Sequence, residues 1–105
     1  GVWAQPRLVE AGGGLRAPGD SVLLSCRGDG FYFGDNVIHW YRQAPGGRLE
    51  WVSLIGDDSS IVHSGQSVEG RAMVSRDNSR SESSLSLRVL NPSDSARYFC
   101  AVSTQ

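Results

Sequence analysis

The chain has 105 residues, the length of one domain with a single hydrophobic core, and no linker or internal repeat divides it. Apolar residues make up 39% of it, charged residues make up 20%, and 13 glycines favour short strands joined by many turns. The net charge is −1, and no apolar stretch approaches the roughly 18 residues that span a bilayer, so we expect neither nucleic-acid nor membrane partners.

Short runs in which apolar and polar residues alternate predict an all-β chain. The first clear strand is expected at residues 21–26, where Val22, Leu24 and Cys26 share the inward face. Leu23 lies between them in the sequence. It is therefore expected on the outer face of the same strand.

Three further strands are expected along the chain. Residues 37–43 and 49–55 predict a hairpin around the turn Ala-Pro-Gly-Gly, and residues 83–88 predict a strand with Leu85 and Leu87 inward. Asx and Pro chemistry predicts further turns at residues 17–20, 57–60, 76–79 and 91–94. Strand signals every 8–12 residues are typical of a β-sandwich.

The chain has two cysteines, Cys26 and Cys100. Their separation of 74 positions excludes the CxxC spacing of zinc and redox sites and suits one long-range disulfide. A disulfide implies an oxidising, secretory environment, so we expect an extracellular protein. Closing so long a loop stabilises a fold by about 4.5 kcal/mol in the chain-entropy model.

Cys26, Trp40 and Cys100 have the Cys…Trp…Cys order of immunoglobulin domains. Further motifs are LVEAGGGL at 8–15, RQAPG at 42–46, LEWVS at 49–53, SRDNS at 75–79 and DSARYFC at 94–100. With these motifs the chain resembles the variable region of a mammalian, human-like immunoglobulin heavy chain from about residue 5 to residue 102. The resemblance implies a V-set Greek-key β-sandwich with one inter-sheet disulfide.

The resemblance also implies roles for four framework residues. Trp40 is expected in the core, packed against the disulfide between the sheets. Tyr98, two residues before the second cysteine, is expected to form a tyrosine corner. Arg71 and Asp94 are expected to form an ion pair that closes one end of the sandwich.

By the same resemblance, residues 30–39 and 54–63 correspond to two hypervariable loops that contact antigen. The candidate contacts are Phe31, Tyr32, Asp35, Asn36, Asp57, Asp58, Ser59, Ser60 and His63, a mixture typical of paratopes. The alternative is that Phe31 and Phe33 pack beneath their own loop and that residues 57–58 form only a solvated turn. The antigen is not identified by these residues.

The resemblance implies a second surface that pairs with an immunoglobulin light chain. Its residues are expected to be His39, Tyr41, Gln43, Leu49 and Trp51. Tyr41 and Arg48 stand where the family usually has Val and Gly. This resembles heavy-chain-only domains, but somatic mutation gives the same residues, and we favour mutation.

Catalysis is not expected. His39 and His63 are the only histidines, too few for a metal site of three or four converging ligands, so no metal or cofactor is expected. The disulfide uses both thiols, and no G-x-S-x-G motif is present. Asp57 and Asp58 are adjacent on a polar turn and lack the contrasting burial that separates two carboxyl pKa values.

The two ends depart from the family pattern. Five residues follow Cys100, whereas the family continues through a third hypervariable loop and a W-G-x-G strand, so we expect a sandwich without its last strand. That leaves the edge of the Tyr98 strand unpaired. Residues 1–4 resemble a retained leader remnant, which leaves residues 5–105 as the variable domain.

Ala72 and Ser83 stand where the family has Phe and Leu, losses that typically cost about 2–5 kcal/mol each. Together with exposed Leu23 and an open edge, they favour an alternative, in which the same segment self-associates as the core of a cross-β amyloid fibril. A variable-like domain of a T-cell receptor ranks third.

Overall fold

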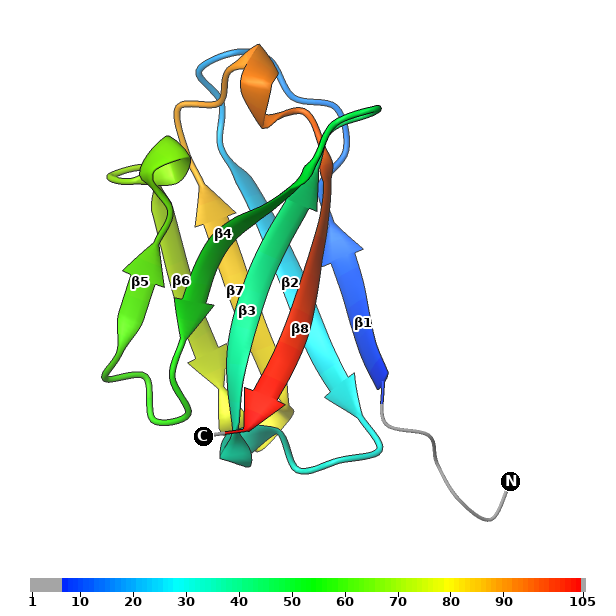
Figure 1. Cartoon of the computed structure of the whole chain (residues 1–105), viewed down its shortest axis with the longest axis vertical. Helices are drawn as coiled ribbons and strands as arrows, with labels where there is room; N and C mark the ends of the chain where they lie inside the picture. Colours follow the sequence, from blue (N-terminus) through cyan, green and yellow to red (C-terminus); the bar gives the residue numbers. More distant parts are fainter. Residues whose placement is uncertain (1–6, 105) are drawn as a thin grey trace.

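In the computed structural model, residues 7–104 are described. They form two antiparallel four-stranded sheets packed face to face (Figure 1). This confirms the predicted all-β sandwich. The predicted leader remnant at residues 1–4 lies outside the described residues.

The strands follow the alternating segments of the sequence. They are β1 (Arg7–Gly12), β2 (Val22–Asp29), β3 (Asn36–Gln43), β4 (Leu49–Ile55), β5 (Val62–Ser64), β6 (Ala72–Asp77), β7 (Glu82–Leu87) and β8 (Arg97–Thr104). Four short 3-10 turns join them: η1 (Phe33–Asp35), η2 (Gln66–Val68), η3 (Asn78–Arg80) and η4 (Pro92–Asp94). The predicted hairpin of residues 37–43 and 49–55 is the β3–β4 pair, and residues 83–88 correspond to β7.

One sheet has the strand order β1-β2-β7-β6, and the other has the order β5-β4-β3-β8. The chain crosses between the sheets after β2, β5 and β7, so strands far apart in sequence become neighbours, as β2 and β7 do. Within residues 7–104, β8 pairs only with β3. One edge of β8 therefore has no strand partner in this part of the chain.

The core lies between the two sheets, where the inward positions of each strand meet. Cys26 and Cys100 form the predicted disulfide, and Trp40 and Cys26 are fully buried. The other buried apolar side chains are Leu24, Phe33, Ile38, Val52, Ile55, Val68, Val74, Leu85 and Leu87. The disulfide thus joins β2 of one sheet to β8 of the other.

Two positions singled out in the sequence occupy different environments. Ser83 is 1% exposed, and its hydroxyl donates a hydrogen bond to the carbonyl of Ser75 and accepts one from the indole of Trp40. Leu23, as predicted, projects from the outer face and is 62% exposed. Ala72 is half-buried against the core.

Candidate functional site

The two segments that the sequence marks as hypervariable meet at one end of the sandwich (Figure 1, lower end). Residues 30–35 connect β2 to β3 and pass from one sheet to the other, and residues 56–61 connect β4 to β5 within one sheet. The strands on either side hold the ends of both loops. Loops on such a scaffold can vary in sequence at little cost to the core.

Arg76, on β6, binds the backbone of both loops. Its guanidinium donates hydrogen bonds to the carbonyl oxygens of Gly56 at 2.6 Å, Asn36 at 2.7 Å and Phe33 at 3.0 Å. It also lies over the Phe33 ring, 5.1 Å from the centroid, in cation–π contact. Burial lowers the pKa of Arg76 below its ordinary value. One cation therefore fixes the positions of two separate loops.

The second loop has its own hydrogen bonds. Asn78, which accepts a hydrogen bond from Arg76 at 2.7 Å, donates one to the backbone carbonyl of Asp57 at 2.9 Å. The carboxylate of exposed Asp58 accepts from the backbone N–H and the hydroxyl of Ser60, at 2.9 and 2.6 Å. These bonds lower the pKa of Asp58 and hold the tip of the loop in a defined turn.

The candidate contacts differ in exposure. The exposed ones are Tyr32, which is 68% exposed, Asp35, Asp58, Ser59, Ser60 and His63, and the half-buried ones are Phe31, Asn36 and Asp57. Phe33 is fully buried, and Phe31 packs against the core beside it with the ring centroids 6.3 Å apart. The apolar area that loop 30–39 offers to a ligand therefore comes mainly from Tyr32.

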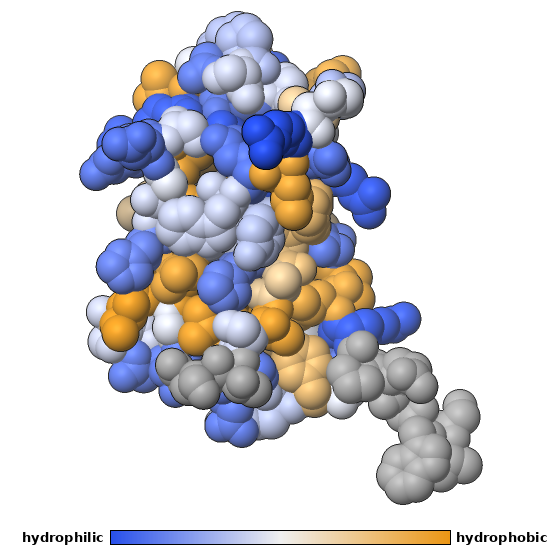
Figure 2. Space-filling model, viewed as in Figure 1, coloured by the Kyte–Doolittle hydropathy of each residue, from blue (hydrophilic) through white to orange (hydrophobic). Residues whose placement is uncertain are grey.

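The outer face of the β5-β4-β3-β8 sheet carries a row of stacked rings. The rings of His39 and Tyr41 lie 6.3 Å apart, and Tyr41 and Phe99 have the same spacing. Of the five residues predicted for this face, Gln43 and Leu49 are exposed, and His39, Tyr41 and Trp51 are half-buried. Figure 2 shows apolar side chains among polar ones over the lower half of this face. Phe99 was not predicted to belong to this surface, although it alternates with inward Cys100.

A network of buried charges closes the opposite end of the sandwich. Asp94 accepts hydrogen bonds from Arg71 at 2.8 Å, from Arg42 at 2.9 Å and from the backbone N–H of Asn91 at 3.0 Å. Burial by itself raises the pKa of Asp94, but these three hydrogen bonds outweigh it and lower the pKa to about 2. The expected Arg71–Asp94 pair is thus one part of a larger network.

Arg42 is the hub of this network, and it was not predicted. It is 5% exposed and also donates to Glu50 and to the hydroxyl of Tyr98. The hydrogen bond from Arg42 lowers the pKa of Glu50. The Tyr98 hydroxyl in turn donates to the carbonyl of Asp94 at 2.8 Å, the geometry of a tyrosine corner.

The sequence does contain a signal for both missed arginines. Arg42 is in phase with the inward residues Ile38 and Trp40, and Arg76 is in phase with Val74. A charged residue at an inward position of a strand must find buried partners, because an unpaired buried charge is very costly. The alternation therefore marks both positions, but it does not say what the partners are.

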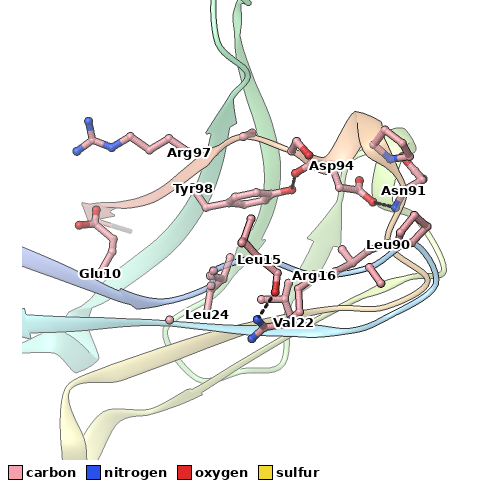
Figure 3. Close-up of a pocket in the computed structure, with 18 of the residues that line it drawn as sticks. Glu10, Leu15, Arg16, Val22, Leu24, Leu90, Asn91, Asp94, Arg97 and Tyr98 are labelled. Atoms are coloured by element: carbon pink, nitrogen blue, oxygen red, sulfur yellow. Dashed lines mark hydrogen bonds between the residues drawn. The ribbon is translucent and has the colours of Figure 1, made fainter.

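A groove of about 530 Å³ runs between β1 and the open edge of β8. Figure 3 shows Tyr98 projecting from β8 over this groove, with its hydroxyl directed to Asp94. Other lining residues include Val22, Leu24, Trp40 and Leu90, so the groove reaches the core. The Cys100 N–H faces away from β3 and donates to the Glu10 carboxylate at 3.4 Å. Side chains thus satisfy part of the β8 edge.

Between residues 7 and 104, no cluster of three or more His, Cys, Asp or Glu side chains could hold a metal ion. In the same range, the chain forms no helix that is long and apolar enough to cross a membrane.

Comparison with protein families matches residues 15–105 to the model of the immunoglobulin V-set domain. The matched part contains both cysteines, Trp40 and the strands from β2 to β8. It also contains both loops that Arg76 joins.

Proposed function

Because the chain belongs to the immunoglobulin V-set family, whose members are in general binding modules rather than enzymes, we propose that it is the variable domain of a secreted immunoglobulin heavy chain. It binds antigen through residues 30–39 and 54–63. The observation that carries this proposal is the Arg76 clamp, which holds the two loops at one end of a disulfide-linked sandwich. Such preorganisation lowers the entropy lost on binding.

The exposed residues of the two loops have the chemistry of a paratope. Tyr32 supplies a large amphipathic side chain with little conformational entropy, and Asp58, Ser59 and Ser60 supply hydrogen-bonding groups on a fixed turn. The antigen surface that fits them combines an apolar pocket for the tyrosine with hydrogen-bond donors for the aspartate.

The face of stacked rings supports pairing with a light-chain variable domain. Leu49 is 56% exposed at the start of β4, and the rings of Tyr41 and Phe99 are stacked on the same sheet. Aromatic and aliphatic groups on a flat sheet, with few charges among them, are typical of the core of a protein interface.

The groove beside β8 is a suitable place for a ninth strand to pair. Variable-type domains have nine strands, and residues 7–104 contain eight. A strand added at the open edge of β8 would cover the groove and pair with the outward backbone groups of Cys100. This edge is where the W-G-x-G strand of the heavy-chain family would pair.

Pairing is tested by mixing the domain with kappa and lambda light-chain variable domains and measuring heterodimers by sedimentation velocity. We expect L49D to weaken pairing at least about tenfold, which is about 1.4 kcal/mol. L23D is the matched control, because Leu23 is equally exposed but lies on the opposite sheet. Equal effects of the two variants, or no pairing with any light chain, would contradict the proposal.

Antigen binding is tested on arrays of immobilised proteins and small molecules. We expect Y32A and D58A to abolish the hits that the unmodified domain gives, because both side chains are exposed in the proposed loops. S95A, at the other end of the sandwich, is the control and should retain them. Hits that survive both loop variants would place binding elsewhere.

The open β8 edge favours a second candidate, self-assembly into cross-β fibrils. Agitated samples would then give filaments with a meridional spacing of about 4.7 Å. Val102 shares the outward backbone orientation of Cys100, so V102P blocks that edge and spares the pairing with β3. Delayed growth is expected for V102P and not for V102T, and a stable monomer throughout would refute this candidate.

A further inference from the structure

The outer face of the β1-β2-β7-β6 sheet has side chains in cross-strand rows, and the middle row is unusually small. Ser25 of β2, Ser84 of β7 and Ser75 of β6 are in register, and Ala11 of β1 continues the row. None of these four side chains is charged. A solvent-facing sheet usually carries charges that keep other sheets away, and this row lacks them.

The next row, on the side away from the hypervariable loops, adds apolar groups. Leu23, Ser86 and Met73 are in register on β2, β7 and β6. Leu23 is 62% exposed and Met73 is 72% exposed. Two large apolar side chains thus flank a serine, beside a row made entirely of small side chains. The two rows form an uncharged patch of small and apolar side chains that another sheet can approach closely.

Charges of opposite sign border this patch toward the loop end. On the β1–β2 side, Arg7 and Arg27 share the single carboxylate of Asp29, at 3.3 and 3.4 Å, which leaves excess positive charge. On the β7–β6 side, Glu82 and Asp77 lie in the same row as Arg27. One half of the row is therefore basic and the other half is acidic.

We propose that this sheet face, from Ala11 to Met73, is a self-association surface that binds a second copy of the same chain face to face. A two-fold axis parallel to the strands, between β2 and β7, exchanges the two halves of each row. Arg27 of each copy then lies over Glu82 of the other. The charged row is self-complementary under this operation.

The same axis also matches the uncharged rows. Ser25 of one copy lies over Ser84 of the other, and their short side chains let the sheets stack closely. Leu23 lies over Ser86 of the second copy and next to its Met73, one strand further along. Both exposed apolar side chains are then removed from water.

This surface is separate from the antigen-binding loops and from the face of stacked rings. Self-association would therefore be a third binding interaction, beside those with antigen and with the light chain. The patch and its charged border cover only three rows of one sheet, and so small an interface is expected to be weak. Self-association is measured by sedimentation equilibrium of the full chain from about 10 µM to about 1 mM, the range of weak affinities. We expect the average mass to rise toward that of a dimer.

Charge reversal identifies the surface. R27E and E82R should each weaken dimerisation at least about tenfold, and the double variant R27E/E82R should restore it to within about threefold, because the reciprocal pairs re-form. R48E and E69R change the net charge equally at exposed sites outside the patch and should have no effect. A monomer at all concentrations, insensitivity to the single reversals, or no restoration in the double variant would overturn the proposal.

Two leucine variants separate this surface from the light-chain face. L23D should abolish self-association and leave light-chain pairing unchanged, and L49D should do the opposite. Circular dichroism and thermal unfolding establish that each variant is folded. If L49D rather than L23D abolished the homodimer, the dimer would use the other sheet and the inference would be wrong.

Discussion

Replacing Asp94 by Asn tests whether the buried charge network stabilises the sandwich. The carboxylate is 3% exposed and accepts hydrogen bonds from both Arg42 and Arg71. D94N removes the negative charge and leaves the side chain of Arg42, which is 6% exposed, with only Glu50 as a counter-ion. We expect the free energy of unfolding to fall by about 2–4 kcal/mol at neutral pH.

The pH dependence gives the magnitude independently. The pKa of Asp94 falls from its ordinary value of 3.8 to about 2 in the fold, which corresponds to a contribution of roughly 2 kcal/mol. Because the folded pKa is depressed, this stability is fully present above about pH 4. It is lost as the pH falls toward 2. The D94N variant cannot lose this contribution, so its deficit relative to the unmodified chain should shrink at low pH.

The assay is urea denaturation followed by tryptophan fluorescence, with the disulfide intact, at about pH 7 and about pH 2. D35N, at an exposed carboxylate, is the control and should change stability by less than about 0.5 kcal/mol. A D94N deficit that is equal at the two pH values, or no larger than that of D35N, would refute the role assigned to the network.

Three further predictions concern the loops, the disulfide and the core. Replacing Arg76 by Ala removes hydrogen bonds to four loop carbonyls, so amide exchange measured by mass spectrometry should accelerate at least about tenfold in both loops. Acceleration in one loop alone would contradict the clamp. Reducing the Cys26–Cys100 bond should lower the free energy of unfolding by about 4.5 kcal/mol in denaturant titrations, and a change under 1 kcal/mol would show that the loop closure contributes little. S83A leaves the buried N–H of Trp40 without its acceptor and should lower the free energy of unfolding by about 1–3 kcal/mol. Equal stability of S83A and the unmodified chain would show that this hydrogen bond is dispensable.

The alternation of the sequence was sufficient to predict which residues face the core. Leu24, Cys26, Leu85 and Leu87 are buried as predicted, and Leu23 is exposed. Side chains in a strand point to opposite faces in turn, so burial on one face follows from local sequence alone. The disulfide was also predictable, because the chain has only two cysteines.

The partners of the buried arginines were not predictable in the same way. Arg42 meets Asp94 across 52 positions of sequence, and Arg76 meets the carbonyl of Asn36 across 40. No local pattern specifies contacts of this kind, because they arise only when β3, β6 and the 3-10 turns are packed together. The exposure of Tyr32 and the burial of Phe33 likewise depend on how η1 packs against the core.

By itself, the sequence determined the fold class, the disulfide and the faces of the strands, because these features depend on periodicity and on the covalent order of the residues. The two loops were identified through the resemblance to heavy-chain variable regions. Only the tertiary structure decided that one arginine joins both loops, that Asp94 belongs to a network, and which side chains lie in register with Leu23 and Arg27 on the outer face of their sheet. Those features depend on register between strands, which is set by the packing of the whole sheet.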